Sequence, residues 1–141
     1  MTQSNVSVFV YGTLQPGEFY YSQYCAETVV ASCRAIAHGL LFDLPAGYPA
    51  MTKGEGIVRG FLLSFDDSSV LASLDELEEY HPERADTENE YQRQCVEVFT
   101  LNHQPLGFAW TYLMSIEQAT QLGGILIPHG KWSAHRQNSA L

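Results

Sequence analysis

The alternation of hydrophobic and polar residues predicts a chain built mostly from strands. The first strand is expected over residues 6–11, where valines alternate with serine, phenylalanine and tyrosine. A longer strand over 28–43 is expected to bend either at 32–34 or at Gly39. Apolar runs predict further strands over 50–52, 56–65, 90–101 and 106–114. Residues 53–55 look like a hairpin turn between the first two of these strands.

Helical periodicity is clearest between residues 70 and 80, directly after the capping residues 66–69. Shorter helices are predicted over 18–27 and over 115–122, the latter because it opens with a capping box and ends at two glycines. Many strands with few helices predict an α+β fold, a small barrel or curled sheet with helices outside it. The 141 residues are expected to form a single domain, 1–141, whose polar tail, 133–141, frays.

Composition narrows the classes of partner. The chain has 16 acidic and 7 basic residues, a formal charge of −9, and no Lys/Arg cluster, which predicts that it binds neither nucleic acid nor an anionic membrane surface. No apolar stretch is long enough to span a membrane, and the N-terminus has no signal-peptide pattern. Cys25, Cys33 and Cys95 form no Cys-x-x-Cys pair, so reduced thiols in a cytoplasmic protein are expected. The 5 histidines are scattered without ligand spacing, so no metal is expected.

The first candidate site lies where the first strand ends, at Tyr11-Gly12-Thr13-Leu14. The strand breaks there into glycine, threonine and a Pro-Gly pair, which form turns. Backbone amides at such a strand end can hold a carboxylate or a carbonyl oxygen. An ordinary strand-to-loop turn would have the same local sequence, so the residues alone leave both interpretations open.

The second candidate is Glu78 on the strongest helix. At about 100° per residue, the valine and three leucines of residues 70–77 form one apolar face, and Glu78 falls on it. Asp75, Glu76 and Glu79 fall towards or on the solvent side. Desolvation would raise the pKa of Glu78 towards neutrality, as a general acid/base requires. Alternatively, Glu78 lies at the edge of the apolar stripe and bends out to water.

These segments together resemble the gamma-glutamylcyclotransferase-like superfamily, including its AIG2-like and gamma-glutamylamine cyclotransferase branches. Residues 11–14 match its Tyr-Gly-Ser/Thr-Leu strand end, and residues 74–78 match its Leu-Asp-x-x-Glu motif, which gives Glu78 the catalytic position. Glu79 stands where the family commonly has glycine, so a changed helix end is expected. Three further matches follow in the family's order: Tyr91-Gln92-Arg93, Trp110-Thr111-Tyr112 and Gly130-Lys131-Trp132.

The resemblance implies a mixed barrel-like sheet and the cyclisation of a gamma-glutamyl amine or peptide to 5-oxoproline and a free amine. Glu78 would carry the proton, and neither a metal nor an organic cofactor is needed. The amides of Gly12, Thr13 and Leu14 would hold the substrate carboxylate or the developing oxyanion. The candidates to shape the pocket or donate hydrogen bonds are Tyr11, Tyr91 and Tyr112, each of which would also suit a buried core.

Two other functions fit the same residues. A non-catalytic metabolite-binding module would keep the strand-end cradle for a glutamyl-like ligand without converting it. An unrelated hydrolase would use Glu78 together with Asp75, two carboxylates three residues apart on one helix. The motifs specify neither the amine portion of the substrate nor the oligomeric state.

Overall fold

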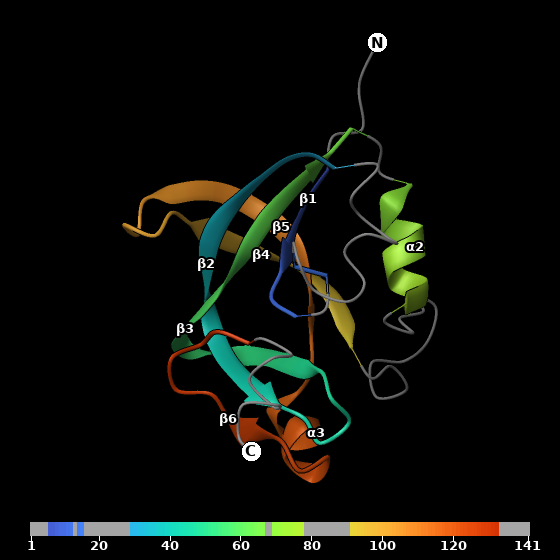
Figure 1. Ribbon diagram of the computed structural model, residues 1–141, viewed down its shortest axis with the longest axis vertical. Coiled ribbons are helices and arrows are strands. Elements are labelled where there is room, and N and C mark those ends of the chain that lie inside the picture. Colours follow the sequence, from blue (N-terminus) through green and yellow to red (C-terminus); the bar gives the residue numbers. More distant parts are fainter. Residues whose placement is uncertain (1–5, 13, 16–28, 67–68, 78–90, 133–141) are drawn as a thin grey trace.

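The computed structural model of the chain describes residues 6–12, 14–15, 29–66, 69–77 and 91–132. Six strands and two helices lie within this part of the chain (Figure 1). The strands are β1 (Val6–Val10), β2 (Val29–Asp43), β3 (Pro49–Phe65), β4 (Gln92–Phe99), β5 (Pro105–Leu113) and β6 (Ile125–Leu126). The helices are α2 (Val70–Leu77) and α3 (Ile116–Gln121).

The strands form one mixed sheet in the order β3-β1-β5-β4-β2-β6, and β2 also pairs with β3. This additional pairing closes five of the strands into a ring of hydrogen-bonded neighbours. The β1–β5 pair is parallel, whereas the other pairs are antiparallel. The predicted α+β fold with a small, mixed, barrel-like sheet is therefore confirmed.

The predicted hairpin turn at residues 53–55 is wrong. Residues 49–65 are one strand, and both of its halves pair with β2, through Thr52 opposite Leu40 and Ile57 opposite His38. The extra residues of β3 lie opposite Gly39, where the register between β2 and β3 shifts. A Cβ atom on Gly56 would lie 2.8 Å from the Gly39 carbonyl oxygen, so glycine permits this close approach.

The β2–β3 connection is the loop of residues 44–48, which contains a proline and a glycine. Its ends are joined by a hydrogen bond of 3.1 Å from the Leu44 amide to the Tyr48 carbonyl. Gly47 adopts φ 101°, a left-handed conformation that glycine accepts readily. The loop also leads directly into Pro49, which becomes important at the candidate site.

Strand β1 is buried more completely than its alternating sequence indicates. Val8, Phe9 and Val10 are all at most 3% exposed, so residues on both faces of the strand are covered. The reason is its position: β1 pairs with β3 and β5 on its two edges, and α2 lies beside it (Figure 1). Val70 and Leu74 of α2 belong to the same buried cluster as the valines of β1.

Helix α3 and strand β5 both form where the sequence predicts them. In helix α3 the predicted N-cap is confirmed, because the Ser115 hydroxyl accepts a hydrogen bond of 3.1 Å from the Gln118 amide, and Gly123 at φ 84° follows the helix. Strand β5 is confirmed, and Phe108 within it is 67% exposed. This residue lies near the free end of the β4–β5 hairpin, which extends away from the rest of the sheet in Figure 1.

Two predicted segments lie outside the described residues: the helix at 18–27 and the frayed tail at 133–141. The same holds for the last three residues of the predicted helix 70–80. Neither helix in the described part of the chain is long and apolar enough to cross a lipid bilayer.

Candidate active site

The chain leaves β1 through a tight, buried turn. The Gln15 amide donates to the Gly12 carbonyl at 3.0 Å, and the Gln15 side-chain nitrogen donates to the same carbonyl at 3.3 Å. That nitrogen also donates to the Trp132 carbonyl at 3.1 Å, which ties the turn to the end of the described chain. Both bonds within the turn use the carbonyl of Gly12, so its amide is not used to close the turn. Thr13 lies outside the described residues.

Gly12 lies against the ring of Pro49. A Cβ atom on Gly12 would come within 2.7 Å of the Pro49 Cγ and 2.9 Å of its Cδ, closer than real Cβ atoms approach other atoms. The proline ring is stiff, so a side chain at residue 12 would displace the backbone of one segment or the other. The glycine of the Tyr-Gly-Thr-Leu string is therefore required by a close backbone approach.

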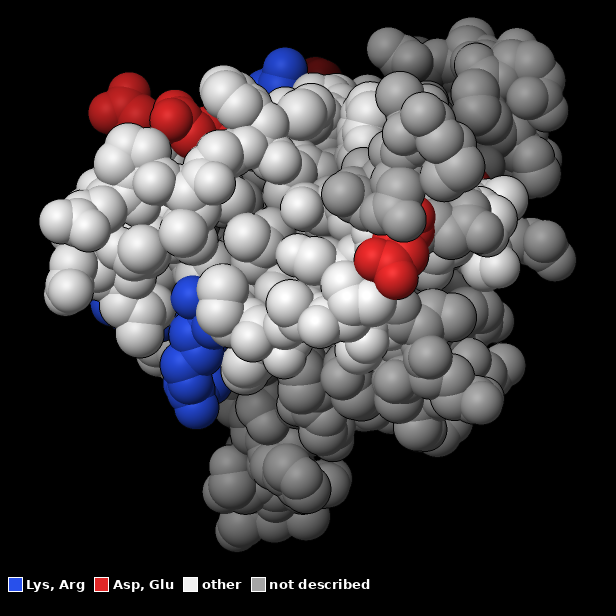
Figure 2. Space-filling model, turned by 90° about the horizontal axis from the view of Figure 1, so that it is seen from above, with Lys and Arg blue, Asp and Glu red and all other residues white. Residues whose placement is uncertain are grey.

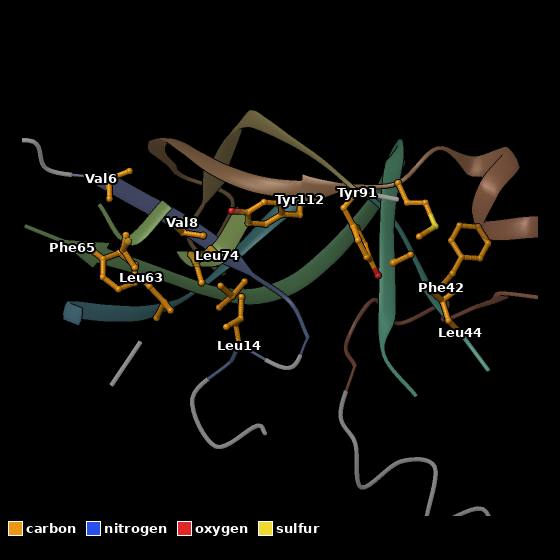
Figure 3. Close-up of a cluster of buried hydrophobic side chains, with 14 of the residues drawn as sticks. Val6, Val8, Leu14, Phe42, Leu44, Leu63, Phe65, Leu74, Tyr91 and Tyr112 are labelled. Atoms are coloured by element: carbon orange, nitrogen blue, oxygen red, sulfur yellow. The ribbon is translucent and has the colours of Figure 1, made fainter. Parts of the chain in front are cut away.

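The three candidate tyrosines are buried around this turn, each at most 7% exposed. The Tyr11 hydroxyl donates to the Tyr112 carbonyl at 2.5 Å, and the Tyr91 hydroxyl donates to the Pro49 carbonyl at 2.7 Å. Tyr91 and Tyr112 share a buried cluster with Leu14, and Figure 3 shows their rings among its side chains. The sheet thus brings together five of the predicted site residues, which are Tyr11, Gly12, Leu14, Tyr91 and Tyr112.

The helical-wheel prediction for Asp75, which places its side chain towards solvent, is wrong. Its side chain is only 14% exposed. One carboxylate oxygen accepts a hydrogen bond of 2.7 Å from the Tyr112 hydroxyl, and the other lies 3.2 Å from Arg93 Nη1. The guanidinium of Arg93 also lies 5.0 Å from the centre of the Trp110 ring, which is a cation–π distance. Partners on β4 and β5 therefore hold this carboxylate against the sheet.

This contact fixes the helix that leads to Glu78. Leu74 is fully buried in the cluster that contains Leu14, and the next residue, Asp75, bonds to the sheet. Side chains of α2, the strand-end turn and β5 consequently meet in one place, with Leu14, Leu74 and Tyr112 grouped in Figure 3. Glu78 itself lies outside the described residues, one position beyond the end of α2.

Comparison with known proteins identifies the family of this chain. The sequence profile of the family described as "Gamma-glutamyl cyclotransferase, AIG2-like" matches residues 8–134. The chain belongs to this family.

Two relatives with cyclotransferase names support the assignment. A Vibrio cholerae protein named as a gamma-glutamylcyclotransferase is 34% identical over 125 residues, which cover 89% of this chain and 93% of that protein. The gamma-L-glutamyl-butirosin B gamma-glutamyl cyclotransferase of Niallia circulans is 35% identical over 107 residues. That match covers 76% of this chain but only 65% of the longer relative.

The fold agrees with a solved structure of the family. An AIG2-like protein from Mus musculus superposes with a TM-score of 0.66 at 20% identity, covering 92% of this chain and 88% of that one. At this identity the likeness concerns the fold alone.

Four contributors to the site have no role predicted from the sequence: Asp75, Arg93, Pro49 and Gln15. The helical wheel places Asp75 towards solvent, and the Tyr-x-Arg motif identifies no partner for Arg93. Pro49 and Gln15 carried no local signal, because their roles depend on segments far away in the sequence. The Tyr-x-Arg and aromatic-x-Tyr spacings were the available clue, since they place a cation and a hydroxyl on neighbouring strands. Among the described residues, no group of three or more His, Cys, Asp or Glu side chains is arranged to hold a metal ion.

Proposed function

We propose that this chain is an enzyme that converts a gamma-glutamyl amine or peptide to 5-oxoproline and the free amine, with Glu78 as the general acid/base. The observation that carries the proposal is the anchored helix α2. Leu74 packs with Leu14 of the strand-end turn, and Asp75 bonds to Tyr112 and Arg93. The helix that leads into Glu78 is thereby packed against the turn that would hold the substrate.

The proposed reaction is intramolecular. The substrate's α-amino nitrogen attacks its own γ-carbonyl carbon, a five-membered lactam forms, and the bond from that carbon to the amine portion breaks. The α-ammonium group first loses one proton to solvent and becomes the nucleophilic amine. Glu78 takes the second proton, which the attacking nitrogen loses as the ring forms, and returns it to the departing nitrogen, which leaves as the neutral amine. Holding the amine and carbonyl in a reactive geometry is then the main task of the protein.

The strand-end turn supplies the proposed electrostatic component. The amides of Gly12, Thr13 and Leu14 would receive the substrate carboxylate or the oxyanion that develops on the γ-carbonyl. The close contact between Gly12 and Pro49 holds this backbone in place. We assign Tyr11, Tyr91 and Tyr112 to the walls of the pocket, because each hydroxyl already donates to an acceptor in the protein.

The proposed chemistry uses no redox step, so it calls for no organic cofactor. A reducing compartment such as the cytoplasm suits the chain, because Cys33 and Cys95 are both free and exposed. The proposed partner is a small gamma-glutamyl molecule.

The experiment is a direct assay of 5-oxoproline release from a panel of gamma-glutamyl amines and gamma-glutamyl dipeptides. Wild type should release 5-oxoproline from at least one of them, and Glu78→Gln should lower kcat by about 100-fold or more. Glu79→Gln is the matched control, because it makes the same chemical change one residue away. Unaltered circular dichroism in both variants would exclude unfolding as the cause.

Two outcomes would contradict the proposal. Activity of Glu78→Gln close to that of wild type would remove Glu78 as the proton carrier. Saturable binding of gamma-glutamyl compounds without 5-oxoproline release from any of them would instead assign the chain to the metabolite-binding alternative.

A further inference from the structure

A hollow lies next to the strand-end turn, on the side of Gln15. Its volume is about 130 Å³, and its lining includes Gln15, Arg34, Arg59, Gly60, Phe61 and Lys131. None of Tyr11, Tyr91, Tyr112 and Asp75 lines it. It is therefore separate from the cluster of candidate catalytic and substrate-binding residues.

The charge of this hollow is opposite to that of the chain. Three of the 7 Lys and Arg residues line it, and none of its described lining residues is acidic, although the formal net charge is −9. On the described part of the surface in Figure 2, most side chains are neither acidic nor basic. Within the described part of the chain, neither the Arg34 nor the Arg59 guanidinium forms an ion pair or a side-chain hydrogen bond. The Arg34 and Arg59 side chains are both exposed, and an anion between them would lower their mutual repulsion.

The fold brings these cations together from three segments. Arg34 on β2 lies opposite Phe61 on β3, and its guanidinium stands 5.6 Å from the centre of that ring. The Arg59 amide donates to the Gly130 carbonyl at 2.7 Å, which holds the segment that carries Lys131 beside β3. Gly130 has φ 70°, and a Cβ atom there would lie 1.9 Å from the Ile57 carbonyl oxygen, so only glycine allows this docking.

The wall between the hollow and the cradle is a buried polar side chain. Gln15 is only 4% exposed, and its side-chain nitrogen holds the carbonyls of Gly12 and Trp132. Gly60 also lines the hollow, and a Cβ atom there would lie 2.2 Å from the Val10 carbonyl oxygen, so glycine permits this close approach of β3 to β1. The hollow therefore adjoins the turn that we propose as the substrate cradle, with Gln15 in contact with both.

We propose that this hollow is a binding site for a small oxyanion group, a phosphate or a carboxylate. The volume corresponds to about four water molecules at ~30 Å³ each, which is enough for such a group. Guanidinium groups bind both oxyanions through paired, charge-assisted hydrogen bonds. The group could be free in solution, or it could be a carboxylate on the amine portion of a gamma-glutamyl substrate held in the neighbouring cradle.

The primary test is a titration of the protein with inorganic phosphate at constant ionic strength, followed by amide NMR shifts. Wild type should show saturable shifts at Gln15, Gly60 and Phe61. The double variant Arg34→Gln/Arg59→Gln should weaken the binding by about tenfold or more, because each guanidinium contributes charge-assisted bonds. Lys53→Gln is the matched control, since Lys53 is an exposed cation on the same strand that does not line the hollow, and it should bind as wild type does.

The proposal is overturned if phosphate causes no saturable shift in wild type, or if the double variant binds as tightly as wild type. An equal loss of binding in Lys53→Gln would overturn it as well, because the effect would then reflect overall charge. Retained amide dispersion in the double variant shows that it is folded.

A second arm identifies the source of the oxyanion, and this arm rests on the proposed function. KM is measured for a gamma-glutamyl dipeptide with an acidic second residue and for one with a neutral second residue. A rise in KM for the acidic dipeptide alone, in the arginine double variant, assigns the site to the substrate. Equal KM values combined with lost phosphate binding assign it to a free anion. Phosphate binding requires no turnover, so failure of the proposed enzyme activity leaves the first test intact.

Discussion

Replacement of Asp75 by asparagine should destabilise the protein measurably. The carboxylate accepts one hydrogen bond of 2.7 Å from Tyr112 and lies 3.2 Å from Arg93 Nη1. Asparagine keeps an acceptor for Tyr112 but removes the charge that faces the guanidinium. The expected cost lies between that of an exposed pair, about 0–1 kcal/mol, and that of a fully buried one, about 3–5 kcal/mol.

The exposure of the two partners sets the magnitude within that range. Asp75 is 14% and Arg93 20% exposed, so water compensates part of the loss. We expect the free energy of unfolding to fall by about 2 kcal/mol. For 141 residues the entropy of unfolding is about 0.3 kcal/mol per kelvin, so Tm should fall by about 7 °C.

Urea unfolding measures this change as a lower midpoint with an unchanged m value. A double-mutant cycle with Arg93→Gln should give a coupling energy of about 1 kcal/mol. Glu97→Gln on the exposed face of β4 is the control and should lie within about 0.5 kcal/mol of wild type. If Asp75→Asn were as stable as wild type, or if the coupling were zero, Asp75 would not anchor α2 to the sheet.

Three further predictions concern the site. Gly12→Ala should cost about 1–3 kcal/mol of stability, because its Cβ would overlap the Pro49 ring, and 5-oxoproline release should fall with it; an unchanged urea midpoint would contradict this. Tyr91→Phe removes the hydrogen bond to Pro49 and should cost about 1 kcal/mol in thermal unfolding, whereas an unshifted Tm would show the bond to be dispensable. The rate of 5-oxoproline release should rise with pH as Glu78 loses its proton, and residual activity of Glu78→Gln should lack that rise.

The sequence alone determined the features whose free energy depends only on residues close together in the chain. Ser115 and Gly123 mark the two ends of helix α3, because capping and left-handed glycine geometry depend on adjacent residues only. The strand at β1 and the inward face of α2 followed from periodicity, with Leu74 fully buried as expected. The family resemblance also rested on short strings in order, which a single sequence displays completely.

Tertiary structure decided the features that depend on distant partners. A helical wheel treats α2 as isolated, so it could not anticipate that Arg93 and Tyr112, far along the chain, would draw Asp75 inward. Lys53-Gly54-Glu55 reads locally as a turn, yet both flanking segments pair with β2, and only that pairing makes them one strand. The free energy of an ion pair or of a strand pair depends on both segments that form it. A pattern along one of these segments does not identify the other, so it cannot predict the pairing.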